Sequence, residues 1–234
     1  MDLTNDPKVQ EAYSMTDYLY LDIETLPCDD PAFRENVLAG IKAPGNYTKP
    51  ESIADWMEKN RESAADEIIA KTSFDGGRGS VCCVAWAWNG GRVNEAHVSD
   101  VHQLDEAFVV TDLMANFGNY KSITPVGHNL IGFDLPFLLK RAIILGVPIG
   151  RQFPRNPKPW DKGVHDTMLM WDAKNFTSLD TLCEIMGIPG KGDFDGSMVA
   201  AAWAAGEREK VAEYCADDVR RVRAVHQRFL AAGW

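Results

Sequence analysis

The sequence predicts one α/β domain in which helices cover a mixed β-sheet. Three observations carry this prediction: strand-like segments open the chain, helix-like and strand-like segments then alternate, and helix-like segments alone close it. The chain has 234 residues, and it shows neither a repeat at a solenoid period nor a low-complexity segment. A single domain over residues 1–234 therefore fits the pattern better than two small ones.

The first three strands are predicted from composition and one turn signal. Residues 18–23 are rich in aromatic and branched side chains, and residues 81–88 are apolar throughout, as in a strand that is buried on both faces. The sequence Asn-Gly-Gly at 89–91 is typical of a hairpin. We therefore expect residues 92–98 to form an antiparallel edge strand.

Residues 27–79 form an insertion between the first two strands. The segment is rich in Pro and Gly up to Pro50, and it then has partial helical spacing of apolar residues over 52–69. Because the insertion starts just after Thr25, we predict that its helix shields one side of any site at the end of the first strand.

The later elements follow from apolar spacing and from stop signals such as Gly146 and Pro148. The predicted helices and strands are a helix at 104–117, a strand at 123–127, a helix at 135–145, a strand at 164–166, and helices at 178–186, 197–205 and 207–229.

Composition excludes several classes of protein. No uninterrupted apolar stretch approaches the roughly 20 residues of a membrane-spanning helix, so no membrane association is expected. Residues 1–15 are polar and acidic, unlike a secretory signal. The five cysteines contain no C-x-x-C pair, which favours reduced thiols in a cytoplasmic protein over a cysteine zinc site.

The net charge of −10 argues against a protein that binds nucleic acid through its overall field. Binding would need divalent metals on carboxylates or a local cluster of basic residues. Segment 151–162 has such a cluster, with four basic residues, one acidic residue and two aromatic residues (Arg151, Arg155, Lys158 and Lys162; Asp161; Phe153 and Trp160). It fits a nucleic-acid contact and a solvated Pro-rich connection equally well.

Asp22 and Glu24 place two carboxylates on one face of the first strand, because side chains two apart on a strand point the same way. With 34 acidic residues, about five such pairs arise by chance, so spacing alone is weak. Mutual repulsion favours a bound cation or proton, and a solvated strand end is the alternative.

Two further motifs carry acids beside apolar segments. Asp134 follows a strand and starts a helix, where it either caps the helix or presents a carboxylate to a metal beside the sheet. Tyr214 and Asp218 share one helix face, next to an apolar line that includes Cys215. An acid beside a buried seam favours a metal or a partner.

The three motifs DIET, NLIGFD and YCADD occur in the order that is typical of the DnaQ-like (DEDD) 3′–5′ exonuclease superfamily, and the sequence resembles its tyrosine subclass, DEDDy. The stretches GHNLIGFDLPFL, HDTMLMW and KGDFDGS are similar to a phage and bacterial family of predicted exonucleases related to the proofreading domain of family B DNA polymerases. The resemblance covers residues 18–229 and is loosest over 27–74. It implies an RNase H-like fold with a five-stranded mixed sheet flanked by helices, and a domain core at 17–230. It also implies that the protein is located in the cytoplasm of a bacterium or of a phage-infected host.

The resemblance also implies the site. Its catalytic acids, which would bind two divalent metal ions, Mg²⁺ or Mn²⁺, are Asp22, Glu24, Asp134 and Asp218. Oxygen ligands favour such hard ions, and two ions suit phosphodiester hydrolysis. Tyr214 would orient the attacking water.

Substrate contacts implied by the same resemblance are Thr25, Leu26, Asn129, Phe133 and Lys191. Leu26 has a core role as its alternative. Two neighbours are set apart from these: His128 is expected to be a structural hydrogen-bonder, and Asp166 either caps the next helix or touches the site.

The implied function is a metal-dependent 3′–5′ exonuclease that releases 5′-mononucleotides from single-stranded DNA ends in DNA replication and repair. The same chemistry on RNA is an alternative, because metals and phosphates do not read the sugar. A non-catalytic nucleic-acid-binding subunit is a further alternative. A polymerase or another replication protein acting in trans is the candidate protein partner.

Overall fold

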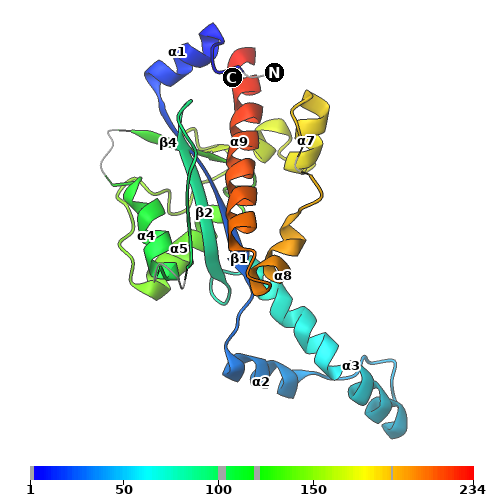
Figure 1. Cartoon of the computed structure of the whole chain (residues 1–234). Coiled ribbons are helices and arrows are strands. Elements are labelled where there is room, and N and C mark those ends of the chain that lie inside the picture. Colours follow the sequence, from blue (N-terminus) through cyan, green and yellow to red (C-terminus); the bar gives the residue numbers. More distant parts are fainter. Residues whose placement is uncertain (1–2, 100–103, 119–121, 191) are drawn as a thin grey trace.

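The computed structural model describes residues 3–99, 104–118, 122–190 and 192–234 (Figure 1). Its elements, in chain order and with η for a 3₁₀ helix, are α1 (Pro7–Met15), β1 (Asp17–Leu26), α2 (Pro31–Gly40), α3 (Pro50–Ala70), η1 (Lys71–Phe74), β2 (Ser80–Trp88), β3 (Asn94–His97), α4 (Glu106–Ala115), β4 (Ile123–Gly127), α5 (Asp134–Leu145), β5 (His165–Asp166), α6 (Thr167–Trp171), α7 (Leu179–Met186), η2 (Gly196–Met198), α8 (Val199–Ala204) and α9 (Arg208–Ala232).

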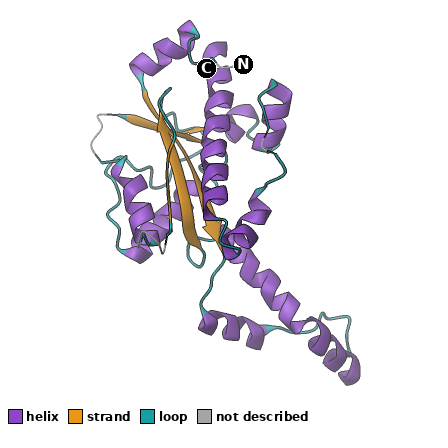
Figure 2. Ribbon diagram, viewed as in Figure 1, coloured by secondary structure: helices purple, strands orange, loops and turns teal. Residues whose placement is uncertain are grey.

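The strands form one mixed five-stranded sheet in the order β3-β2-β1-β4-β5. The central strand β1 runs antiparallel to β2 and parallel to β4, and β4 pairs in parallel with β5. The predicted hairpin is confirmed, since β2 and β3 pair antiparallel and β3 lies at the sheet edge. The mixed sheet with helices on both faces confirms the predicted fold class (Figure 2).

The alternation of side chains along β1 assigns its two faces to different layers. Leu19 and Leu21 pack in a core with residues of α4 and α5, whereas Tyr18 and Tyr20 pack in a second core with residues of α9. Figure 1 shows α9 along one face of the sheet and α4 and α5 on the other. The following side chains on the same face of β1 as Tyr18 and Tyr20 therefore point toward α9.

The first strand is longer than predicted, and three helices were missed. Because β1 extends to Leu26, Asp22 and Glu24 lie within a paired strand, flanked on one side by β2. The missed helices α1, α2 and α6 have five to ten residues, and each begins after an aspartate that caps it. Their apolar spacing is too short to stand out from the sequence.

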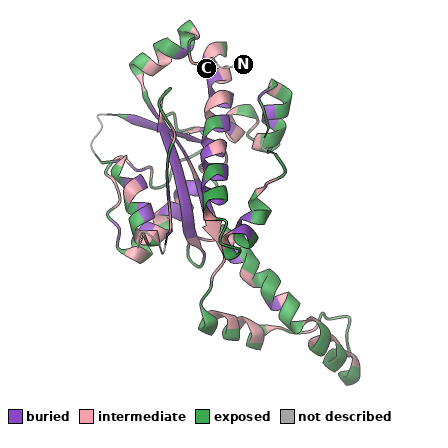
Figure 3. Cartoon of the chain, viewed as in Figure 1, coloured by how far each residue is buried: buried purple, intermediate pink, exposed green. Residues whose placement is uncertain are grey.

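The insertion forms the helices α2 and α3, which project from the sheet and are mostly exposed (Figure 3). The two helices are held together by Arg34, whose guanidinium pairs with Glu62 and Asp66. The predicted helix at 52–69 is confirmed as α3, which leads through η1 back to β2. Among the described residues, no helix combines the length and apolar character needed to cross a membrane.

Candidate active site

Asp22 and Glu24 project from β1 on the face that α9 covers. They oppose Ala85 and Cys83 of β2, and the register shifts directly after Glu24. A bulge of this kind re-aims the following side chains and is common beside functional sites. Glu24 is 9% exposed.

Asp134 reaches the same strand from α5. Pairing of β1 with β4 ends at Tyr20 and Val126, which leaves the next part of this edge of β1 open. The buried carboxyl of Asp134 accepts a hydrogen bond from the backbone N–H of Ile23 at this open edge. The N-cap residue of α5 is Phe133, so Asp134 is the first helical residue and does not occupy the N-cap position. Its carboxyl also accepts from its own backbone N–H at the start of the helix. The chain thus uses this strand-to-helix corner to present a carboxylate to β1.

The three carboxyls of Asp22, Glu24 and Asp134, called here the acid cluster, repel one another. Burial raises the pKa of Asp22 well above its usual range, and the charges of Glu24 and Asp134 raise it further. The pKa of Asp134 is also raised, chiefly by burial. Carboxyl groups so close together cannot all be ionised at low cost unless a cation offsets their charge. Their oxygen atoms are suitable ligands for a divalent cation. The donor set therefore fits hard ions such as Mg²⁺ or Mn²⁺.

Cys215 lies against this cluster, which sequence reasoning did not foresee. Its thiol donates to the carboxylate Oδ2 and the backbone oxygen of Asp22, both at 3.5 Å. Ligand atoms of Asp22, Glu24 and Cys215 lie within 4.8 Å of one another. The apolar spacing on α9 did place Cys215 on the helix face that packs against the core. This spacing was the only feature of the sequence that pointed to the contact.

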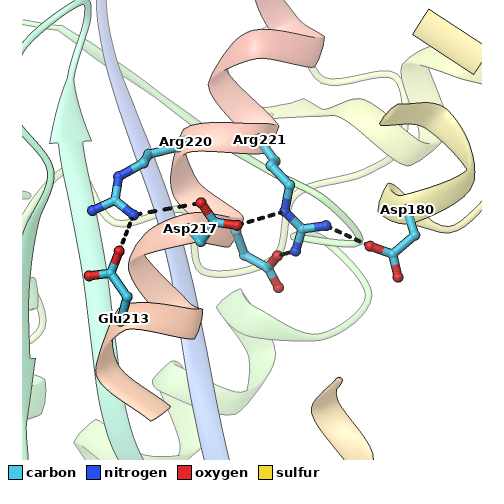
Figure 4. A network of polar contacts seen from close by, with 6 residues as sticks. Asp180, Glu213, Asp217, Arg220 and Arg221 are labelled. Carbon is cyan, nitrogen blue, oxygen red and sulfur yellow. Dashed lines mark hydrogen bonds and ion pairs between the residues drawn. The ribbon is translucent and has the colours of Figure 1, made fainter. Parts of the chain in front are cut away.

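Asp218 is nearly buried one turn after Tyr214, and it is ion-paired with Arg221. The Arg221 guanidinium also lies 2.5 Å from Asp180 of α7 and 3.5 Å from Asp217 (Figure 4). Within the described residues, the close group of ligand atoms includes neither Asp134 nor Asp218. The charge of Asp134 nevertheless acts on Asp22, whereas Asp218 is paired with a buried arginine. Of the four predicted ligands, the structure thus places Asp22 and Glu24 side by side and brings Asp134 near them.

Tyr214 faces the acid cluster from α9. Its ring packs edge-on against Phe194 at 5.0 Å between centroids, and its hydroxyl lies 4.0 Å from the position that a Cβ on Gly196 would occupy. Burial, together with the charges of Glu24 and Asp22, raises the pKa of Tyr214. The hydroxyl therefore keeps its proton at neutral pH, beside the acids.

A pocket of about 680 Å³ opens next to Glu24, and we call it the β1 pocket. Thr25 and Phe133, two of the predicted substrate contacts, line it. The other lining residues come from β1, from the insertion and from the segment around α8 (Ile23 and Pro27; Glu67, Ala70, Lys71, Ser73 and Phe74; Gly196, Ser197 and Ala200).

Two other predicted substrate contacts, Leu26 and Asn129, do not line the β1 pocket. Leu26 packs against the core on the α9 side, as its alternative role required. Asn129 adopts a left-handed backbone with φ of 60° and donates its N–H to Asp166. Lys191 falls outside the described residues.

The insertion is joined to β1 at this pocket. The Thr25 hydroxyl donates to the Ser73 carbonyl at 2.7 Å, and the Cys28 N–H donates to the Thr72 hydroxyl at 2.7 Å. The exposed ring of Phe74 lies edge-on to Phe133, 6.4 Å between centroids. The end of α3 and η1 therefore wall one side of the site, as the position of the insertion predicted.

Asp166 and His128 support the loop that leads into α5. Asp166 is buried and accepts hydrogen bonds from the N–H groups of Asn129, Ile131 and Met168, so it both caps α6 and holds the loop before Asp134. His128 Nε2 donates to the Thr177 carbonyl at 2.9 Å, which confirms its structural role.

We expect His128 to make the protein less stable in acid. Burial lowers the pKa of His128 to about 4, from 6.5 for an exposed histidine, so the unfolded chain binds more protons between these values. Stability is lost as the pH falls through this window. Relative to His128→Gln, the wild-type free energy of unfolding should drop by about 3 kcal/mol from pH 7 to pH 4, measured by urea unfolding. A pH-independent difference would contradict this.

A family model described as "Predicted 3'-5' exonuclease related to the exonuclease domain of PolB" matches residues 79–232. This range contains Asp134, Tyr214 and Asp218, whereas Asp22 and Glu24 precede it. No curated protein matches the chain.

Among solved structures, the chain is similar to the family B DNA polymerase from the hyperthermophilic archaeon Pyrobaculum calidifontis. The TM-score is 0.57 at 19% sequence identity, over 92% of this chain and 24% of the polymerase chain. The chain thus spans about a quarter of that protein, and at this identity the similarity supports the fold alone. It covers more of the chain than the range that the family model matches.

Proposed function

Because the chain belongs to the family of predicted 3′–5′ exonucleases related to the PolB exonuclease domain, we propose that it is a metal-dependent 3′–5′ exonuclease of the DEDDy type. Its proposed substrates are single-stranded DNA ends, which it hydrolyses to 5′-mononucleotides. The observation that carries the proposal is the acid cluster, two carboxyls on β1 and one from the start of α5, with raised pKa values for Asp22 and Asp134. A non-catalytic binding subunit would have no need to keep carboxyl groups that repel one another.

Asp22, Glu24 and Asp134 would hold two divalent ions, with Asp218 as the fourth ligand. When bound, such ions supply Lewis-acid stabilisation of the phosphodiester and lower the pKa of water. The protein's part is to keep these carboxyls buried and oriented: the Ile23 N–H fixes Asp134, and the Cys215 thiol fixes Asp22.

Tyr214 would position the attacking water through its neutral hydroxyl, since a phenol with a raised pKa is a poor base. We expect Tyr214→Phe to lower kcat by about 10- to 100-fold with little change in KM, because the ring packing is retained while the hydroxyl is lost. Steady-state hydrolysis of a labelled oligonucleotide measures both constants. An unchanged kcat would remove Tyr214 from the mechanism.

The β1 pocket would bind the 3′-terminal nucleotides. Its volume lies in the range of sites for small organic ligands, and the exposed Phe74 ring at its rim offers a stacking surface. We expect Phe74→Ala to weaken the binding of a single-stranded 3′ end by about 10-fold, from the usual contribution of one base stacked on an aromatic ring.

The matched control is Phe176→Ala, which removes an equally exposed ring that does not line the β1 pocket. Binding is measured by fluorescence anisotropy on an inactive Asp134→Asn background, so that the oligonucleotide stays intact. Equal affinities for the two alanine variants would contradict the assignment.

The test of the function uses one sequence as 5′-labelled single-stranded DNA and as RNA, incubated with Mn²⁺, Mg²⁺ or chelator. A metal-dependent ladder that shortens from the 3′ end, absent with Asp134→Asn, supports the exonuclease, and the relative rates rank the two sugars. Faster loss of the RNA would turn the proposal to an exoribonuclease. Intact polymers that are nevertheless bound would support a binding subunit and overturn the enzyme.

A further inference from the structure

Segment 151–162, called here the basic segment, lies outside the site described above. Its four basic residues and one acidic residue give a local charge of +3 in a chain whose net charge is −10. Arg151, Arg155, Lys158 and Lys162 are all exposed. Within the described part of the chain, none of them forms an ion pair with a carboxylate. Four unneutralised cations so close in sequence form a local site for an anion despite the acidic whole.

The backbone of the basic segment is anchored to the core. Phe153 is 3% exposed and packs edge-on against Phe117, 5.1 Å between centroids, so its ring belongs to the core and does not face a ligand. Val164, just after the segment, is also buried. Between them, Lys158 and Asp161 close a turn through hydrogen bonds of 2.7 and 2.9 Å. A segment held in this way loses little conformational freedom when it binds a partner.

The exposed surface of the segment combines three features that nucleic acid recognises. Trp160 is 78% exposed within the turn. Beside it, a shallow hollow of about 520 Å³ is lined by Arg155, Asn156 and Lys162, among others. Cations that contact phosphates, with an aromatic ring on which a base stacks, are the usual elements of a surface for single-stranded nucleic acid.

The position of the segment relative to the acid cluster sets the length of strand that can reach both. Helix α5 begins at Asp134 in the acid cluster and ends at Leu145, shortly before the segment. Twelve helical residues span about 18 Å. The Gln152 N–H donates to the carbonyl of Phe117, which follows the end of α4. At the other end of α4, the carboxylate of Glu106 accepts from the backbone N–H at the start of β2, near the cluster. The C-terminal end of the segment lies nearer to the cluster, because Lys162 is only four residues before Asp166, whose charge acts on Asp134. A single strand of a few nucleotides can therefore extend from the cluster to the segment.

We propose that the basic segment is a second nucleic-acid contact surface, which binds the phosphates and one base of a single strand a few nucleotides upstream of the 3′ end held at the acid cluster. Only the direction of the strand rests on the proposed function. The binding itself requires neither metal nor catalysis, since it uses side-chain cations and a ring.

The test compares two triple variants that remove equal charge. Arg155→Gln/Lys158→Gln/Lys162→Gln changes the basic segment, and Lys42→Gln/Arg92→Gln/Lys174→Gln changes exposed cations elsewhere. The probe is a fluorescein-labelled single-stranded DNA of about 20 nucleotides, and its anisotropy is measured in chelator over a range of salt concentrations. Trp160→Ala tests the ring separately, because alanine removes the stacking surface that phenylalanine would keep.

We expect the basic-segment variant to bind at least about 10-fold more weakly than wild type and to lose about 2 from the slope of log affinity against log salt, at 0.7 per phosphate contact. The charge-matched control should change affinity less than 2-fold.

Equal affinity and equal salt slopes in the two triple variants would overturn the proposal, as would a wild-type protein that degrades DNA but does not bind the long probe in chelator. Specific binding in chelator by a protein that hydrolyses nothing would support the basic segment while refuting the exonuclease. The two claims therefore fail separately.

Discussion

Asp22→Asn and Asp134→Asn are each expected to abolish hydrolysis, lowering the rate by at least about 10³-fold, because each removes a carboxylate of the acid cluster that the proposed ions require. The fold should survive the change. The pKa of both groups is raised in the folded protein, so the folded state binds protons more tightly than the unfolded chain, and ionisation above pH 3.8 costs stability. An uncharged amide removes this cost.

We therefore expect both variants to be at least as stable as wild type at pH 7 without metal, as measured by thermal unfolding. Asp17→Asn is the matched control, because Asp17 is exposed at the start of the same strand. It should keep full activity. Loss of activity that tracks a loss of stability would mean that these acids support the fold rather than the chemistry.

Arg221→Met is expected to produce the largest loss of stability. The Arg221 side chain is 4% exposed and lies between Asp218, Asp217 and Asp180 (Figure 4). Removing it leaves the nearly buried Asp218 carboxylate without its partner, which usually costs about 3–5 kcal/mol. Urea unfolding at neutral pH measures the change.

The double variant Arg221→Met/Asp218→Asn should recover much of this loss, since the uncompensated charge is gone. Arg220→Met is the matched control: its side chain is 42% exposed and pairs with Glu213 on the surface, so its removal should cost less than about 1 kcal/mol. Additive effects of the two changes in the double variant would show that Arg221 does not stabilise Asp218.

Much of the fold could be predicted from periodicity. The strand at 123–127 was predicted to the residue, and the helices at 135–145 and 207–229 differ from α5 and α9 by a few terminal residues. A long segment with regularly spaced apolar residues can be recognised whatever the rest of the chain packs against it. The helix α2 could not be predicted, because its ten residues bury none of their side chains fully and are held by ion pairs to α3.

The site was predictable where one element sets the geometry. Alternation along β1 put Asp22 and Glu24 together, and four-residue spacing on α9 put Tyr214 and Asp218 on one face. Contacts that join distant segments leave no such pattern. The pairing of Arg221 with Asp180 and the seating of η1 against Thr25 depend on how α7 and the insertion pack.

The most direct measurement of the central claim compares linear and circular single-stranded DNA of one sequence, with Mn²⁺, under conditions where a single turnover is followed by product analysis. A 3′–5′ exonuclease must release 5′-mononucleotides from the linear strand and leave the circle intact, and Asp134→Asn must release neither product. Cleavage of the circle, or an intact linear strand with metal-loaded wild-type protein, would contradict the account.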